Sequence, residues 1–191
     1  MRRNPIVRTA LLCALCLAIA AGLTAASSKP ILKLKAFAAS LERGRTTLIS
    51  IDIYRWSTDQ EREALLTTLQ EFGQNKLLDT LQKVRPPVGR ISVPGRLGWD
   101  LYYARDTANP DGSRRIIVAT NRAVAFGEAA TNTRSMQYQF TLGEIHLNAE
   151  GEGEGKLVPA ARLSWDKENK KLEIENYSAL PIDLLSVKIQ K

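Results

Sequence analysis

The strongest structural signal in the chain is ILKLKAFAASLERGRTTLISIDIYRW, residues 31–56. Apolar and polar residues alternate through 31–40 and again through 46–56, and a period of two is typical of β-strands with one buried face. Gly44 lies in the short polar break between the two runs and accepts the positive φ that many hairpin connections require. The stretch therefore predicts two antiparallel strands joined by a hairpin.

A helical pattern replaces the alternation after residue 56. Ser57-Thr58 supplies N-cap residue types, and Gln60-Glu61 follows three positions later, as in a capping box. Leucines then recur at helical spacing, Gly73 is suited to end a helix, and a second leucine-rich run reaches the stop at Pro86-Pro87. We expect a pair of helices separated by Gly73, with the leucine stripe packed on a sheet; a docking role for the stripe is the alternative.

Strand-like segments occupy the rest of the chain. They alternate or carry a β-branched centre, and they cover residues 90–93, 98–106, 114–120, 123–126, 136–150, 156–166, 171–177 and 181–190. Asn109-Pro110-Asp111-Gly112 is the clearest hairpin turn, because proline presets φ and glycine accepts the left-handed conformation. We expect one α+β domain over 27–191 that is mainly antiparallel β, a sandwich or a partly open barrel, with the helical pair inserted after the second strand.

The first 26 residues have the outline of a signal peptide. Three arginines accompany TALLCALCLAIAAGLTAA, residues 9–26, which carries no charge and ends in small residues. We expect cleavage near Ala26 and a secreted or periplasmic mature chain, with an uncleaved membrane anchor as the alternative. Cys13 and Cys16 lie inside this leader, so the mature chain has neither a disulfide nor a cysteine metal site.

The charge balance is mildly basic. The whole chain carries a formal charge of +7, which falls to +4 without residues 1–26, because three arginines and no acid are removed. Nucleic-acid binding needs a concentrated basic face, and this balance does not supply one. A weak attraction to anionic polymers of the cell envelope fits the charge better. We therefore expect no nucleic-acid partner and, after cleavage, no stable membrane insertion.

The run GEGEGK, residues 151–156, raises the question of a ligand-binding loop. A P-loop is excluded, since Glu150 stands where its first glycine belongs and Leu157 replaces its hydroxyl residue. An EF-hand needs a bidentate acid at the twelfth position of its loop, which is a proline here. We favour a wide exposed hairpin connection between strands 136–149 and 156–165; the other hypothesis is an unconventional calcium site of Glu150, Glu152 and Glu154.

Candidate catalytic residues are few. His146 is the only histidine, and it alternates with Ile145 and Leu147 in a way that predicts a position on the solvent face of a strand. Alternation also predicts that Tyr102 alone among the aromatic residues is exposed, which is too little for a carbohydrate platform. Nothing in the sequence selects a catalytic pair among the candidate acids, which are Asp52, Asp100, Glu144, Glu173 and Glu175.

Three short segments, YRWSTDQERE (54–63), LYYARD (101–106) and EGEGEGKL (150–157), resemble a group of uncharacterised secreted bacterial proteins. The resemblance implies no activity, cofactor or functional residue. We expect a secreted or periplasmic binding or interaction protein without a cofactor, whose partner is a protein or polymer of the cell envelope. The alternative is an extracytoplasmic hydrolase that uses a carboxylate pair or His146.

Overall fold

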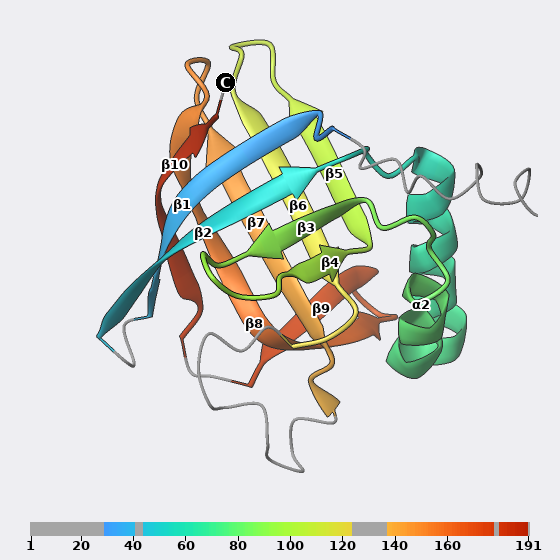
Figure 1. Cartoon of the computed structure of the whole chain (residues 1–191). Coiled ribbons are helices and arrows are strands. Elements are labelled where there is room, and N and C mark those ends of the chain that lie inside the picture. Colours follow the sequence, from blue (N-terminus) through green and yellow to red (C-terminus); the bar gives the residue numbers. More distant parts are fainter. Residues whose placement is uncertain (1–28, 41–43, 124–136, 178–179, 191) are drawn as a thin grey trace, which may run out of the picture.

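The computed structural model describes residues 29–40, 44–123, 137–177 and 180–190. Ten strands form one antiparallel sheet that curls into a nearly closed barrel, with helix α2 (Asp59–Leu81) along one side (Figure 1). The strand order is β4-β3-β2-β1-β10-β8-β7-β6-β5, and β9 pairs with β8 off this path. The strands are β1 Leu32–Ser40, β2 Arg45–Ile53, β3 Gly89–Ser92, β4 Trp99–Leu101, β5 Tyr103–Ala108, β6 Arg114–Thr120, β7 Phe140–Leu147, β8 Glu152–Asp166, β9 Lys171–Asn176 and β10 Ile182–Ile189.

Several predicted elements are confirmed in position. β1 and β2 pair antiparallel from Leu32↔Ile53 to Ser40↔Arg45, as the alternation in 31–56 predicts. The predicted turn after residue 108 joins β5 to β6, and in it the Gly112 N–H donates to the Asn109 carbonyl oxygen over 3.0 Å. The leader at 1–26 with both cysteines, and all of the predicted strand at 123–126 beyond its first residue, lie outside the described residues.

The ends of the sheet are brought together by two local connections. β4 continues into β5 with Tyr102 alone between them, and the Tyr102 N–H donates to the Ala119 carbonyl oxygen of β6 over 3.0 Å. On the other side of the gap, the Ser57 N–H donates to the Ala104 carbonyl oxygen of β5 over 2.7 Å. The Ala104 N–H in turn donates to Ser57 Oγ over 3.1 Å. These bonds link β5 to the segment that follows β2, on the side where the two end strands of the sheet, β4 and β5, are not paired with each other.

The predicted strand at 98–106 is divided at Tyr102, which corrects the expected exposure of that residue. Tyr102 is 8% exposed, and the guanidinium carbon of Arg85 lies 5.3 Å from the centroid of its ring. The reason is that the chain leaves one end of the sheet and enters the other at this position, so the alternation restarts. Leu101 then belongs to the barrel core, and Tyr103 packs against the helix side.

Aliphatic side chains fill the barrel. They are the inward half of the alternation in strands from every part of the sheet, and the largest fully buried ones include Leu34, Ile49, Ile51, Ile53, Ile91, Leu101, Ile116, Ile145, Leu157 and Leu184. Burial of each such side chain contributes about 1.5–3 kcal/mol. The space enclosed by the described strands is thus a packed core, which directs the search for a functional site to the outer surface.

Helix α2 begins with the predicted capping box. Thr58 Oγ1 accepts the Glu61 N–H over 3.1 Å, and the Glu61 carboxylate accepts the Thr58 N–H over 2.8 Å. Gly73, the expected end of the first helix, has a non-helical backbone (φ 76°, ψ −176°), and the helical residues on its two sides meet there at a kink. The two helical halves follow each other without a loop and are labelled together as α2, because glycine allows the non-helical conformation at the kink.

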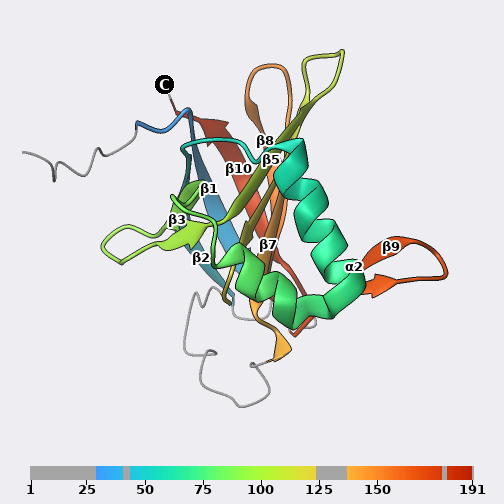
Figure 2. The same ribbon diagram turned by 90° about the vertical axis from the view of Figure 1, so that its right-hand side faces the viewer.

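The helix packs on the outer face of the sheet, as Figure 2 shows. Leu69, Leu77 and Leu81 share a second apolar cluster with Phe140 of β7 and Leu163 of β8. Phe140 and the core residue Ile145 differ in parity along β7, so the two clusters lie on opposite faces of that strand. The leucine stripe is thus part of the core, as predicted. No helix within the described residues is long and apolar enough to cross a membrane.

Candidate functional site

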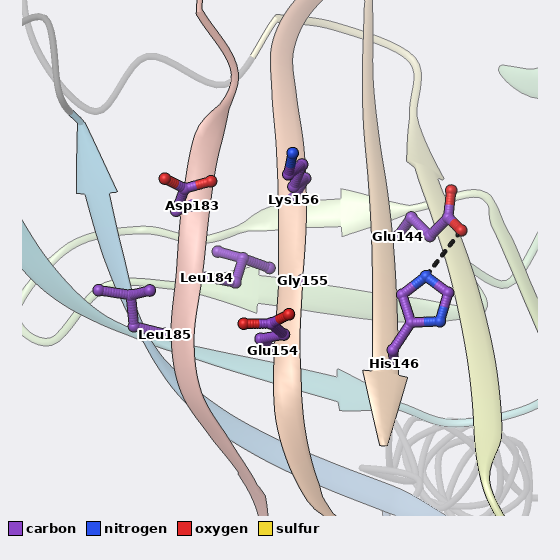
Figure 3. Close-up of a pocket in the computed structure, with 8 residues that line it drawn as sticks. All are labelled: Glu144, His146, Glu154, Gly155, Lys156, Asp183, Leu184 and Leu185. Atoms are coloured by element: carbon purple, nitrogen blue, oxygen red, sulfur yellow. Dashed lines mark hydrogen bonds and ion pairs between the residues drawn. The ribbon is translucent and has the colours of Figure 1, made fainter. Parts of the chain in front are cut away.

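An open depression lies on the outer face of β7, β8 and β10 (Figure 3). Its volume is about 440 Å³, and it is lined by Glu144, His146, Glu154, Gly155, Lys156, Asp183, Leu184 and Leu185. The polar members are the outward half of the alternation that turns Ile145 and Leu157 into the core. His146 is on the solvent face, as predicted, with 60% of its side chain exposed.

Strand register brings these side chains together from three distant parts of the sequence. Glu144 of β7 lies opposite Lys156 of β8, which lies opposite Asp183 of β10. His146 lies opposite Glu154. Directly opposed residues of an antiparallel pair have Cβ atoms within about 5.5 Å of each other, so acids and bases alternate across the face at interaction distance. The sequence alone does not indicate Lys156 and Asp183 as site residues, because their proximity depends on the pairing of β8 with β10.

Glu144 is held by two cationic or potentially cationic neighbours. Its Oε1 accepts from Arg115 Nε of β6 over 2.7 Å and lies 2.9 Å from His146 Nε2. The hydrogen bond from Arg115 holds the pKa of Glu144 below its usual value; partial burial opposes this shift, and His146 adds a smaller lowering effect. A general acid needs a raised pKa. Glu144 is therefore suited to orient His146 and to balance charge, and poorly suited to donate a proton.

A row of exposed apolar side chains adjoins the depression. Phe37 of β1 lies opposite Leu48 of β2 on one side and opposite Leu185 of β10 on the other. The three residues are 47%, 37% and 44% exposed, respectively. The sequence does contain a signal for Phe37. This residue lies on the outward-facing side of β1, at the same parity as Lys33 and Lys35 before it. A large apolar residue on a polar face is the informative exception.

The run GEGEGK forms part of a strand, which corrects the expected wide connection. The turn covers residues 148–151, where the Gly151 N–H donates to the Asn148 carbonyl oxygen over 3.0 Å, and β8 begins at Glu152. A Cβ atom added at Gly153 would collide with the carbonyl oxygen of His146, and one added at Gly155 would collide with that of Glu144. The glycines thus allow β8 to approach β7 closely. In the sequence, the same glycine-rich composition is easily mistaken for that of a loop.

The three candidate calcium ligands occupy different surroundings. Glu150 lies in the turn, Glu152 accepts from Lys188 Nζ of β10 over 2.9 Å, and Glu154 lines the depression. Throughout the described ranges, no group of three or more His, Cys, Asp or Glu residues is placed to hold a metal ion.

The candidate catalytic acids are distributed over three parts of the sheet. Asp52 of β2 and Asp100 of β4 lie on either side of Arg90 of β3, and Arg90 Nε lies 3.9 Å from Asp100 Oδ1. Glu173 and Glu175 lie on β9. Of the five predicted acids, the depression contains Glu144 alone, and the acids that accompany it there are Glu154 and Asp183.

Comparison with known protein families, with curated proteins and with solved structures gives no match to this chain. Inference about function therefore depends on the geometry of the site.

Proposed function

We propose that the protein is a binding protein of the cell envelope, which recognises another protein on the outer face of β2, β1, β10 and β8. The observation that supports this proposal is the row Leu48, Phe37 and Leu185, in which three large exposed apolar side chains stand directly opposite one another. Leu185 also lines the charged depression, so the apolar row and the polar site are continuous. Contiguous apolar surface with a polar rim is typical of interaction sites.

The charges beside the row favour a protein over an anionic polymer. Lys156 and Lys188 would attract a polyanion, but Asp183 and Glu154 stand among them and would repel it. A protein surface that carries both signs can pair with each group, and such complementarity provides specificity and register. The apolar row would supply most of the binding energy, since a few buried side chains dominate protein interfaces.

Hydrolysis is supported less well by the same geometry. His146 is largely exposed, and its near neighbour Glu144 is paired to Arg115. The residues that line the depression include no serine, threonine or cysteine that could act as a nucleophile. The extracytoplasmic location is also part of the proposal, and it rests on the leader sequence in residues 1–26.

The decisive experiment compares two variants of the mature protein as baits in envelope extracts. The first is the double variant Phe37→Ser/Leu185→Ser, which removes the centre and one end of the row. The control is Leu97→Ser, which removes an exposed leucine from the connection between β3 and β4. Captured proteins are quantified by mass spectrometry, and the affinity of the purified partner is then measured by calorimetry.

We expect a partner that binds the wild type and Leu97→Ser equally and binds the double variant about a hundredfold more weakly, as for the loss of two interface anchors. Far-UV circular dichroism and thermal unfolding check that both variants fold. The proposal fails if no protein is enriched on the wild type relative to the folded double variant.

A further inference from the structure

Strand β9 presents an open edge on a different part of the molecule. Residues Lys171 to Glu175 are all exposed, and β9 pairs with β8 alone among the described strands. Figure 2 shows the hairpin of β8 and β9 projecting beside helix α2. The pairing uses β8 residues 161–166, whereas the depression uses β8 residues 154–156. The β9 edge is therefore separate from the face proposed above for the envelope partner.

The register identifies which backbone groups point outward. The Tyr177 N–H donates to the Ala160 carbonyl oxygen over 2.9 Å, so these two residues form a hydrogen-bonded pair. Such pairs alternate along an antiparallel ladder, which places the N–H and C=O groups of Glu175 and Glu173 toward β8. The corresponding groups of Leu172 and Ile174 then point away from β8, toward the open edge.

The opposite edge of this hairpin, on β8, is hydrogen-bonded to a helix side chain. The Leu163 N–H, on the side of β8 away from β9, donates to Gln74 Oε1 of helix α2 over 3.1 Å. The Gln74 Nε2 group donates in turn to the Gln137 carbonyl oxygen over 3.0 Å. A helix side chain thus satisfies the β8 edge, while no described residue bonds the outward N–H groups of Leu172 and Ile174. An edge with such groups is a template for a further strand.

The side chains of β9 define the strand that would fit. Leu172 and Ile174, 40% and 51% exposed, share the face that Leu163 joins to the helix cluster. On the other face, Glu175 accepts from Tyr138 Oη over 2.6 Å and lies 3.6 Å from Arg162 Nη1. Glu173 has only a 3.5 Å contact with Ser164 Oγ. Lys171 is exposed on the same face as Glu173. An incoming strand therefore needs apolar residues opposite Leu172 and Ile174, a cation opposite Glu173 and no cation opposite Lys171.

A second copy of β9 does not meet this requirement. An antiparallel pairing centred on Glu173 places Lys171 opposite Glu175 at both ends but places the Glu173 carboxylate opposite its own copy. A pairing centred on Ile174 places Glu173 opposite Glu175 on both sides. In both full-length registers Glu173 therefore faces a carboxylate, and neither register gives it a cationic partner.

We propose that the β9 edge docks an extended segment of a partner protein in which apolar residues alternate with polar ones and a lysine or arginine lies opposite Glu173. The outward N–H and C=O groups of Leu172 and Ile174 would extend the ladder to this segment. Glu173 would then form an ion pair with the central cation, in the closely spaced position where side chains of opposed strands are nearest.

The probe is a labelled peptide of about eight residues, the length of an ordinary strand, in which valine alternates with threonine except for one central lysine. Its affinity for the mature protein is measured by fluorescence anisotropy, beside a matched peptide with glutamate in place of lysine. We expect the lysine peptide to bind at least about tenfold more tightly, because only it complements Glu173. The variant Glu173→Lys is expected to reverse this preference.

The matched variants Ile174→Pro and Ile174→Val test the backbone pairing. Proline removes the outward N–H and leaves the bonds to β8 in place, whereas valine keeps the N–H group. We expect Ile174→Pro to weaken binding at least about tenfold and Ile174→Val to retain it. The Phe37→Ser/Leu185→Ser variant is expected to bind the peptide as the wild type does, which separates this site from the proposed envelope-protein face.

Amide hydrogen exchange in the wild type gives an answer that is independent of the folding of any variant. Bound lysine peptide should slow exchange at Leu172 and Ile174 and leave Glu173 and Glu175 unchanged, because the latter two are already bonded to β8. The proposal is overturned if the two peptides bind equally, if these two amides are unaffected, or if the Phe37→Ser/Leu185→Ser variant loses peptide binding. A concentration-dependent dimer that Ile174→Pro abolishes would instead identify a second copy as the occupant.

Discussion

Ser57 closes the barrel against Ala104: its N–H donates to the Ala104 carbonyl oxygen over 2.7 Å, and its Oγ accepts the Ala104 N–H over 3.1 Å. Ala104 is fully buried, so its N–H has no access to water. A side chain thus provides a bond that a neighbouring strand provides elsewhere in the sheet.

Ser57→Ala should therefore lower the free energy of unfolding by about 1–3 kcal/mol, the cost of a buried N–H without an acceptor. Urea denaturation measures this change. Ser164→Ala is the control, because Ser164 is exposed and its hydroxyl has only a 3.5 Å contact with Glu173; its effect should stay within about 0.5 kcal/mol. Equal effects of the two substitutions would contradict the role of Ser57 at the seam.

The glycines of β8 are expected to differ from the hairpin glycine in their tolerance of a side chain. Gly153→Ala should destabilise the protein by about 3 kcal/mol, since the new methyl group collides with the backbone at His146 and cannot be relieved by a side-chain rotation. Gly44→Ala meets no atom within 4 Å and should cost about 1 kcal/mol, for its positive φ alone. Thermal and urea unfolding of both variants would show whether Gly153 is the more sensitive position.

Glu61 makes the stability of the start of helix α2 depend on pH. Its carboxylate accepts two hydrogen bonds from Arg55, at 2.8 and 2.9 Å, and these bonds are the main reason that its pKa is lowered. The carboxylate therefore stabilises the folded state at neutral pH, and this contribution is lost as the pH falls through the lowered pKa.

Glu61→Gln should accordingly cost about 1 kcal/mol at neutral pH, a modest value because about a third of each partner is exposed. The difference from the wild type should shrink on acidification. Glu63→Gln serves as the control, since Glu63 pairs with Arg62 at the exposed surface and should change stability by less than about 0.5 kcal/mol. A difference for Glu61→Gln that does not vary with pH would refute the ion-pair explanation.

Arg115→Gln should raise the pKa of Glu144 toward its ordinary value, because Arg115 provides the principal lowering effect. An NMR titration of the Glu144 carboxyl carbon measures the shift. Arg114→Gln is the matched control: Arg114 is the adjacent residue of β6 but pairs with Asp106, at 2.6 Å, so the pKa of Glu144 should not change. An unaltered titration in Arg115→Gln would show that Glu144 is governed by other neighbours.

The local signals in the sequence are sufficient for most of the strands and for the start of the helix. The alternation in 31–56 predicts β1 and β2 with their pairing, and the capping residues Thr58 and Glu61 predict where α2 begins. Each signal comes from residues that are close together in the sequence, so local backbone geometry and side-chain chemistry are enough to determine the structure. Glycine is less informative: Gly73 interrupts the helical conformation at a kink without a loop, and Gly153 belongs to a strand that composition predicts to be a loop.

The candidate site could be predicted only in part, because it depends on which strands are neighbours. Exposure of His146 follows from its parity in β7. The proximity of Glu144, Lys156 and Asp183 follows from the order β7-β8-β10, which no local pattern encodes. The same is true of Phe37 and Leu185, which are far apart in the sequence and directly opposed in the sheet.

The pairing of the first strand with the last also governs how the protein can be made. β1 lies between β2 and β10, so a growing chain that has not yet reached residue 182 lacks a strand from the middle of its sheet. Until that point β1 and β8 each expose an edge that can capture other chains. The native sheet therefore becomes accessible only after β10 has been synthesised, and the folding rate must reflect the search for this distant contact.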